Sequence, residues 1–358
     1  MTEKCDILIS GGGIAGLTAA AAFGTAGFHV ICVDPTPPVT DRDADGADMR
    51  TTAMLQPARA LLTRAGVWDA LAPHGAALDV MQIADAATET GAAREIKAFR
   101  ASDVSDLPFG WNFPNWRLRR ELMARLEGLD SVDFRPGTAT TRFLGRPAEA
   151  RVGLSAGTSV KANLATAADG RNSPMRQAAG ISVTTRRYGQ KALAFAVTHP
   201  IPHDNVSTEV HRTGGPFTLV PLPDRDGMPR SAVVWMDEGP KSVARMALDT
   251  DAFEAEMTER SCHILGPLTL ASRRSIWPII SQIADRLTGT RLALIAEAAH
   301  VVPPIGAQGL NMSLADTTTL LDLAVASPET LGDAAMLDAY QTARYRDIRM
   351  RVTGIDLL

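Results

Sequence analysis

Apolar residues form three consecutive runs of different pattern at the start of the chain. Residues 5–10, CDILIS, are a short run rich in apolar residues, which is typical of a buried strand. Residues 14–27 are rich in alanine and end on glycine, as many helices do, and residues 28–34, FHVICVD, return to a strand pattern. The pattern predicts a strand, a helix and a second strand in succession.

Two later segments show the spacing of one apolar face along a helix. One covers residues 50–66, with Arg50 at its expected start, and the other covers residues 115–127. The faces expected to be buried are formed by Ala58, Leu61, Leu62 and Ala65 in the first helix and by Leu118, Leu122 and Leu126 in the second. Residues 291–295 read as a buried strand, which leads through a loop rich in Pro and Gly to a helix starting near Gly309.

Residues 185–240 alternate in the manner of a sheet. Runs such as ALAFAVTH, FTLVPL and SAVVWM are separated by Gly, Pro and Asp, which favour turns. The histidines of this region, His199, His203 and His211, lack the spacing of a metal site, and we expect them on strand surfaces. Near the C-terminus, a Ser-Pro pair at 327–328 predicts the start of a last helix.

Composition limits the classes of partner. The 358 residues carry 36 basic and 40 acidic side chains, a net charge of -4, so no overall positive field attracts nucleic acid. Three scattered cysteines suit a reducing compartment and predict neither a disulfide framework nor a metal site. Glu3 and Asp6 flank Lys4, unlike a secretory signal, and no apolar run approaches the roughly 20 residues of a membrane helix. We predict a cytoplasmic protein, and contact with the inner face of the membrane stays open.

The turn between the first strand and helix carries a nucleotide-binding pattern. Gly11, Gly13 and Gly16 match G-x-G-x-x-G, and Asp34 ends the second strand near the offset at which an acid meets a ribose. Such glycines allow a tight turn, close approach of a diphosphate and close helix packing, while the helix N-terminus offers free N–H groups. The alternative is a helix–strand contact that happens to be rich in glycine. The residues expected to contact a dinucleotide are Gly11, Gly13, Ile14, Ala15, Gly16 and Asp34.

Two later segments decide between a nicotinamide and a flavin dinucleotide. Residues 165–180, ATAADGRNSPMRQAAG, contain D-G-x-x-S-x-x-R, and residues 291–323 contain an acid followed by Ala-Ala-His and a loop rich in Pro and Gly. Together with the glycine pattern, these segments resemble the signatures of single-component FAD-dependent aromatic hydroxylases. In that family one lobe binds FAD, and NAD(P)H docks transiently without a second glycine pattern.

The middle of the chain is similar to one subgroup, the ubiquinone-biosynthesis hydroxylases. The stretches that carry this resemblance lie in residues 50–71, 110–126, 188–199 and 214–235. The resemblance implies an α/β fold with a Rossmann-like FAD-binding lobe, built on a parallel sheet, and a β-sheet-rich substrate lobe, as in para-hydroxybenzoate hydroxylase. It implies that residues 1–72, 109–180 and 286–358 form the FAD lobe and that residues 73–108 and 181–285 form the substrate lobe.

The resemblance also assigns roles to individual residues. It places Arg50 on the flavin side of the cofactor, with a solvated arginine as the alternative, and it places Arg176 beside the diphosphate or the incoming NAD(P)H. For Asp169 and the following glycine, the alternative is a surface turn. The FAD contacts that the resemblance implies outside the glycine pattern are Arg50, Asn115, Asp169, Gly170, Glu297, Pro304, Gly306, Gln308, Gly309, Leu310 and Asn311.

The late segment departs from the family at one position and supplies the main mechanistic expectation. The family usually carries Gly-Asp where this chain has Ala296 and Glu297, so the acid expected to contact the ribityl chain is longer by one methylene. The helix N-terminus at Gly309 and Leu310 is expected to stabilise negative charge on reduced flavin. No side chain is assigned as a catalytic base, and His300 is expected to have a structural partner.

By resemblance, the reaction is hydroxylation of a polyprenylated phenol with NAD(P)H and O2, through a flavin C4a-hydroperoxide. Since such a phenol lies in the bilayer, peripheral membrane contact and a biosynthetic complex are further expectations. The chain ends on apolar Ile355, Leu357 and Leu358, whereas related chains usually continue, so a missing C-terminal piece is also an expectation. The alternatives are a hydroxylase of a small soluble aromatic compound, a non-catalytic flavoprotein scaffold and a flavin-free NAD-dependent dehydrogenase.

Overall fold

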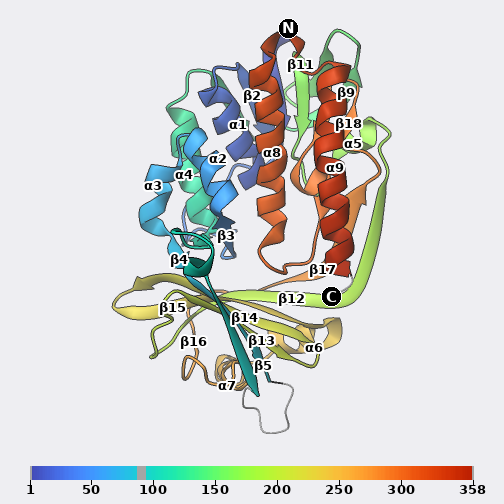
Figure 1. Cartoon of the computed structure of the whole chain (residues 1–358). Coiled ribbons are helices and arrows are strands. Elements are labelled where there is room, and N and C mark those ends of the chain that lie inside the picture. The colour runs from blue at the N-terminus through green and yellow to red at the C-terminus, as the bar shows by residue number, and fades with distance from the viewer. Residues whose placement is uncertain (1, 87–93, 357–358) are drawn as a thin grey trace.

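The computed structural model describes residues 2–86 and 94–356, and it contains two main layers (Figure 1). The upper layer is an eight-stranded sheet covered by helices, and the lower layer is a nine-stranded sheet. The upper sheet runs in the order β18 (Thr288–Gly289), β19 (Leu292–Leu294), β11 (Ser159–Ala167), β1 (Thr2–Ser10), β2 (Val30–Asp34) and β8 (Val132–Pro136). From β19 to β8 all neighbours are parallel, while β10 (Ala150–Leu154) and β9 (Thr140–Gly145) extend the sheet beside β11 in antiparallel fashion.

Helices on both sides bury the parallel sheet. They are α1 (Ile14–Thr25), α2 (Gln56–Arg64), α3 (Trp68–Leu71), α4 (Asn115–Glu127), α5 (Pro174–Ala178), α8 (Gln308–Ala326) and α9 (Ala334–Asp356). All of α1 except Thr25 is buried, because its alanines and glycines let it pack closely against the sheet and against α4 and α8. The apolar faces predicted for α2 and α4 are confirmed as buried.

The lower sheet is mostly antiparallel and crosses beneath the upper layer. Its order is β20 (His300–Val301), β17 (Ser275–Ala284), β12 (Val183–Thr198), β15 (Met228–Glu238), β14 (Gly215–Arg225), β13 (Val206–Arg212), β5 (Val80–Asp85) and β6 (Glu95–Arg100), with β16 (Thr269–Leu270) beside β12. Helices α6 (Gly239–Met246) and α7 (Thr250–Arg260) cover the face that points away from the upper layer (Figure 1). The sheet predicted over residues 185–240 is thus confirmed.

A small three-stranded sheet links the two layers. Its strands are β3 (Thr51–Leu55), β7 (Gly110–Pro114) and β4 (Ala76–Leu78). The buried Asn112 on β7 donates a hydrogen bond from Nδ2 to the Pro221 carbonyl on β14, at 2.8 Å. The link therefore joins the layers through a buried polar contact.

Three details of the sequence reading are wrong. The segment after Arg50 is strand β3 rather than the start of a helix, because Thr51–Leu55 pairs with β7 and the helix begins only at Gln56. His199 is buried rather than on a strand surface, with its ring nitrogens bonded to the Ile201 carbonyl and the Ser231 hydroxyl. The Ser-Pro pair opens a short 3-10 turn, and α9 begins at Ala334 instead.

Within the described ranges, no helix combines the length and apolar character needed to cross a bilayer. Of the apolar C-terminal residues, Leu357 and Leu358 lie outside the part of the chain that the structure describes.

Candidate active site

The sequence motifs meet at one edge of the parallel sheet. The glycine loop follows β1, the Asp-Gly motif follows β11, the segment with Glu297 follows β19, and Asp34 ends β2. These four strands are parallel neighbours, so their carboxyl ends lie side by side, which is where ligands bind in open α/β sheets. Backbone hydrogen bonds from Ala168 to Ser10 and from Ile295 to Ala167 continue the contact beyond the strands.

The three glycines of the loop have different tasks. Gly11 has a φ of +114°, and a Cβ there would collide with the Ala168 carbonyl, while a Cβ on Gly16 would collide with the Gly11 carbonyl. Gly13 has no atom within 4 Å of the position that a Cβ would take. Gly11 and Gly16 therefore permit packing, and Gly13 leaves open space at the N-terminus of α1. That helix has neither a side-chain cap nor an acidic residue in its first turn, which suits an anion.

Asp34 shapes the glycine loop. Its Oδ2 accepts a hydrogen bond from the Gly12 amide at 2.5 Å, and its Oδ1 accepts one from the Thr36 amide at 2.7 Å. Each carboxylate oxygen keeps a further lone pair. The predicted contact with a ribose would use those lone pairs.

Asp169 has an unused acceptor. Its Oδ2 accepts a hydrogen bond from the Met175 amide at 3.1 Å, whereas Oδ1 is buried without a hydrogen-bond partner among the described residues. Burial raises the pKa of Asp169, and hydrogen bonding with the Ser173 side chain and the Met175 amide offsets this only in part. The neighbouring Gly170, with a φ of +82°, has open space at its Cβ position. A buried acceptor beside open space fits the hydroxyl groups of a bound ligand.

The role expected for Arg176 is wrong. The side chain is only 4% exposed and donates to the carbonyls of Ala298 and Arg171, both at 2.8 Å. It joins the Asp-Gly segment to the segment after β19. Because its donors point to backbone carbonyls, Arg176 positions the site and does not present a charge to a diphosphate or to NAD(P)H.

The segment after β19 adopts an unusual backbone. Ala296 has a φ of +55°, the left-handed region in which the family's usual glycine is free of strain. The side chain of Glu297 is 48% exposed and forms an ion pair with Arg171, with Nε–Oε2 at 3.2 Å. Glu297 thus lies at the carboxyl edge of the parallel sheet, and its carboxylate already has a cationic partner, Arg171.

The start of α8 is bound to both neighbouring elements. Asn311 donates from Nδ2 to the carbonyls of Ala53 and Ala307, both at 2.7 Å, and its Oδ1 accepts from the Leu55 amide. Gln308 donates to the Gly306 carbonyl and accepts from Arg351 of α9 at 2.8 Å. These predicted contact residues thus fix the helix start against β3 and α9.

The start of α8 has open space beside Gly309. The N-cap residue Ala307 supplies no side-chain cap, and the first turn contains no acid. A Cβ on Gly309 would meet no atom within 4 Å, and Gly309 itself is exposed. Pro304 and Leu310 are half-buried on either side. The first amides of a helix have no partner within it, so this N-terminus can receive negative charge.

A charged cluster around Asp48 was missed by the sequence reading. The Asp48 side chain is 10% exposed and pairs with Arg50 at 2.8 Å, with Asn115 at 3.0 Å and with Arg119 at 3.4 Å. Burial would raise the pKa of Asp48, but these partners together lower it below its ordinary value. The Arg50 guanidinium also lies 5.6 Å from the ring centre of Trp277 on β17. Asp48 stands in a polar stretch without periodicity, and nothing but its closeness to Arg50 could have indicated it.

An apolar cluster lies where the lower sheet meets the loop before α8. Ala192, Met236 and Ile279 form its buried part, and Tyr188, Val234, Trp277 and Ile305 pack against them. Ile305 belongs to the loop, whereas the others belong to β12, β15 and β17. The cluster therefore places an apolar surface beside the start of α8.

These observations fit a flavin dinucleotide. Open space at Gly13, Gly170 and Gly309, an unused buried acceptor on Asp169 and two uncapped helix N-termini occur at the carboxyl ends of the parallel strands and at the start of α8. A diphosphate suits the first helix N-terminus, and a ring system that gains negative charge suits the second.

Comparison with known proteins gives the family. A family model described as FAD binding domain matches residues 4–353. Ubiquinone hydroxylase UbiL from Rhodospirillum rubrum is 30% identical over 359 residues, which cover 99% of this chain and 81% of that protein. The 3-demethoxyubiquinol 3-hydroxylase of Escherichia coli is 27% identical, with 99% of this chain and 89% of that protein covered.

Solved structures share the fold. The probable FAD-dependent monooxygenase PqsL from Pseudomonas aeruginosa has a TM-score of 0.81 at 22% identity, covering 99% of this chain and 95% of that one. The p-nitrophenol 4-monooxygenase PnpA from Pseudomonas putida has a TM-score of 0.78 at 18% identity, covering 99% and 87%. The predicted fold class is confirmed. The chain belongs to the FAD binding domain family and is an FAD-dependent aromatic hydroxylase.

Proposed function

We propose that this enzyme hydroxylates the aromatic ring of a polyprenylated phenol in ubiquinone biosynthesis, with NAD(P)H and O2 as co-substrates. The observation that carries the proposal is the likeness to ubiquinone hydroxylase UbiL, which extends over 99% of the chain. The apolar cluster beside the start of α8 supports it, because a prenylated phenol needs an apolar surface next to the flavin.

The proposed cofactor contacts follow the sheet edge. Asp34 accepts hydrogen bonds from the adenosine ribose, the amides from Gly13 to Ala15 bind the diphosphate, and Asp169 accepts from the ribityl chain. When bound, FAD supplies the redox chemistry of hydride acceptance and oxygen activation. The amides at the start of α8 stabilise negative charge at the flavin, and the apolar cluster excludes water from the reacting atoms.

The test compares oxygen incorporated into product with peroxide released. The FAD-loaded protein is given NADH or NADPH with prenylated and free phenols, and we expect efficient incorporation with prenylated phenols. Trp277→Ala is expected to release more peroxide, since it opens the apolar cluster, whereas Trp116→Ala on α4 is the matched control. Preference for free phenols would favour the hydroxylase of small soluble compounds. Peroxide alone with every phenol would favour the scaffold.

We further propose peripheral membrane contact through the β5–β6 hairpin. Met81, Ile83 and Phe99 lie on one face of this hairpin, because Met81 pairs with Phe99 and Ile83 follows two residues later. Their exposed fractions are 41%, 44% and 53%. Flotation with anionic phosphatidylglycerol vesicles should decrease for Phe99→Glu and not for Met350→Glu on α9; equal flotation would refute this contact. A biosynthetic complex stays a prediction from the resemblance.

A further inference from the structure

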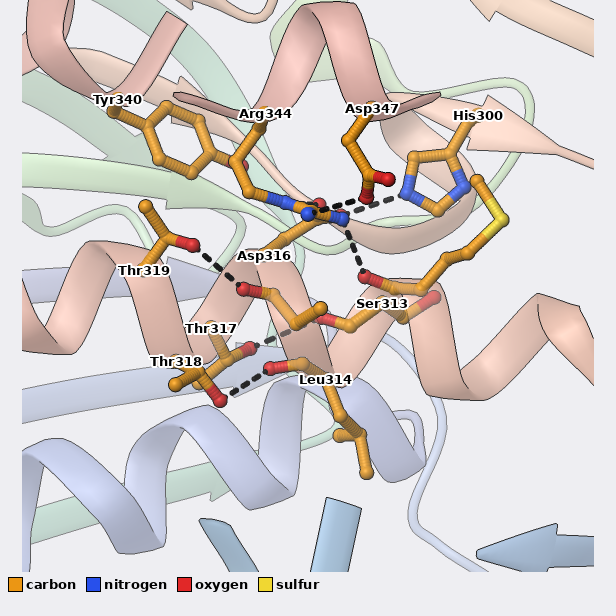
Figure 2. A network of polar contacts seen from close by, with 12 residues as sticks. His300, Ser313, Leu314, Asp316, Thr317, Thr318, Thr319, Tyr340, Arg344 and Asp347 are labelled. Carbon is orange, nitrogen blue, oxygen red and sulfur yellow. Dashed lines mark hydrogen bonds and ion pairs between the residues drawn. The ribbon is translucent and has the colours of Figure 1, made fainter. Parts of the chain in front are cut away.

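A buried ionic network joins α8, α9 and the segment after β19 (Figure 2). Asp316 on α8 is fully buried, and its partners His300 and Arg344 are almost fully buried. Asp316 Oδ2 lies 2.7 Å from His300 Nε2, and Oδ1 accepts from Arg344 Nε at 2.9 Å. Arg344 also pairs with Asp347 at 2.7 Å, so the buried cation has two acidic partners.

The same carboxylate holds the strained backbone after β19. The Ala296 amide donates to Asp316 Oδ2 at 3.1 Å, and Ala296 is the residue with a φ of +55°. A left-handed alanine persists only where the surroundings determine it. Asp316 supplies that constraint, and it does so next to Glu297.

Two further contacts bring α9 into the network. Arg344 Nη2 donates to the Met312 carbonyl in the early part of α8, at 3.3 Å. The Tyr340 hydroxyl donates to the Leu294 carbonyl at the end of β19, at 2.8 Å. Asp316 follows Gln308, the first residue of α8, by about two turns of helix. The network therefore sets the helix start and the segment 294–300 relative to each other.

We propose that Asp316 is a positioning residue for the flavin: by bonding Ala296, His300 and Arg344, it sets where Glu297 and the first amides of α8 face the isoalloxazine and ribityl chain. This rests on the FAD placement proposed above. The three donors come from the flavin side, while the adenosine side is formed by the glycine loop and Asp34. Loss of Asp316 should therefore affect only the flavin half of the cofactor.

The test uses the full chain freed of FAD and titrated separately with FAD and with ADP. Asp316→Asn keeps the shape and removes the charge, and we expect the Kd for FAD to rise roughly tenfold or more, as for loss of a charged hydrogen bond. The Kd for ADP, which lacks the flavin half, should stay unchanged. Asp322→Asn is the matched control, because Asp322 lies on the same helix and pairs with Arg64 at the surface.

A second substitution separates positioning from a general loss of structure. Ala296→Gly removes the backbone strain at the position that Asp316 holds in the left-handed conformation. In the double variant with Asp316→Asn, it should therefore restore much of the lost FAD affinity. As a single substitution, Ala296→Gly should change the Kd for FAD little. Unchanged FAD affinity in Asp316→Asn, an equal loss of FAD and ADP, or no recovery with Ala296→Gly would overturn the proposal. If circular dichroism shows that Asp316→Asn is unfolded, His300→Leu replaces it, because this substitution removes one donor to Asp316. The Kd for FAD should again rise, and the Kd for ADP should again stay unchanged.

One control distinguishes this proposal from the FAD placement on which it rests. Gly13→Val fills the open space at the N-terminus of α1 and should abolish binding of both FAD and ADP. Normal binding of both would overturn the placement. Loss of both in Gly13→Val, combined with normal FAD affinity in Asp316→Asn, would overturn the positioning role alone.

Discussion

Asp48 shows how a single carboxylate can join segments that are distant in sequence. It binds Arg50 next to β3 together with Asn115 and Arg119 of α4, and Arg50 in turn lies over Trp277 of the lower sheet. The cluster therefore ties the segment before β3 and helix α4 to the lower sheet. Hydrogen bonds to charged groups contribute more than neutral ones, so this small cluster has a measurable share in stability.

Asp48→Asn is expected to lower the free energy of unfolding by about 1–3 kcal/mol at pH 7, because a charged, partly buried partner is lost. The folded state lowers the pKa of Asp48 from its ordinary value of 3.8. Its contribution is therefore complete above that value and is lost as the pH falls through the lower folded pKa. Urea unfolding of both proteins from pH 7 to pH 3 measures this. A difference that stays constant across that range would contradict the assignment.

At the residue scale, the sequence was informative at positions where the backbone conformation or the space around it requires a particular amino acid. The glycine loop and the Asp-Gly motif could be predicted because glycine adopts a left-handed turn without strain and leaves room for a ligand. Trp277 could not be predicted, because its partner Arg50 is brought close only by the folding of the two layers. Asp316 left a signal that was overlooked: it is an acid in the stripe of α8 that also buries Met312 and Leu320.

Helix α9 gives a prediction at the scale of an element. The Asp333 side chain accepts a hydrogen bond from the Met336 amide at 2.8 Å, which is the contact of a helix N-cap. Asp333→Ala should lower the melting temperature and cost about 1 kcal/mol, whereas Ser327→Ala, before the short 3-10 turn, should cost little. Thermal unfolding by circular dichroism measures both. A larger loss of stability in Ser327→Ala than in Asp333→Ala would indicate that the helix begins at the Ser-Pro pair, as predicted from the sequence.

Periodicity predicted most elements, and local chemistry misplaced a few boundaries. Helices α2 and α4 were found by their apolar spacing, because each packs one face against the core. Strand β3 was wrongly predicted as the first part of a helix. Its five residues are too few to show alternation, and its partner β7 lies far along the chain. Helix α9 begins later in the chain than predicted, because Asp333 rather than the Ser-Pro pair accepts a hydrogen bond from its first turn.

At the scale of the molecule, FAD should stabilise the chain as a unit. The proposed contacts come from the ends of β1, β2, β11 and β19 and from α8, so unfolding of any of them would release the cofactor. At a free FAD concentration of 100 times Kd, we expect about 2.7 kcal/mol of added stability. Thermal unfolding with and without FAD measures the shift. Gly13→Val should show no shift, and a shift equal to that of the native chain would contradict the placement.

The strand order of the parallel sheet also affects how the chain matures during synthesis. The central strand β1 ends at Ser10, whereas its neighbour β11 begins only at Ser159 and the next strand, β19, begins at Leu292. Until β11 emerges from the ribosome, the buried strand β1 has no partner on one side, and β11 in turn lacks its neighbour until β19 emerges. We therefore expect nascent chains to depend on chaperones until translation has passed β19.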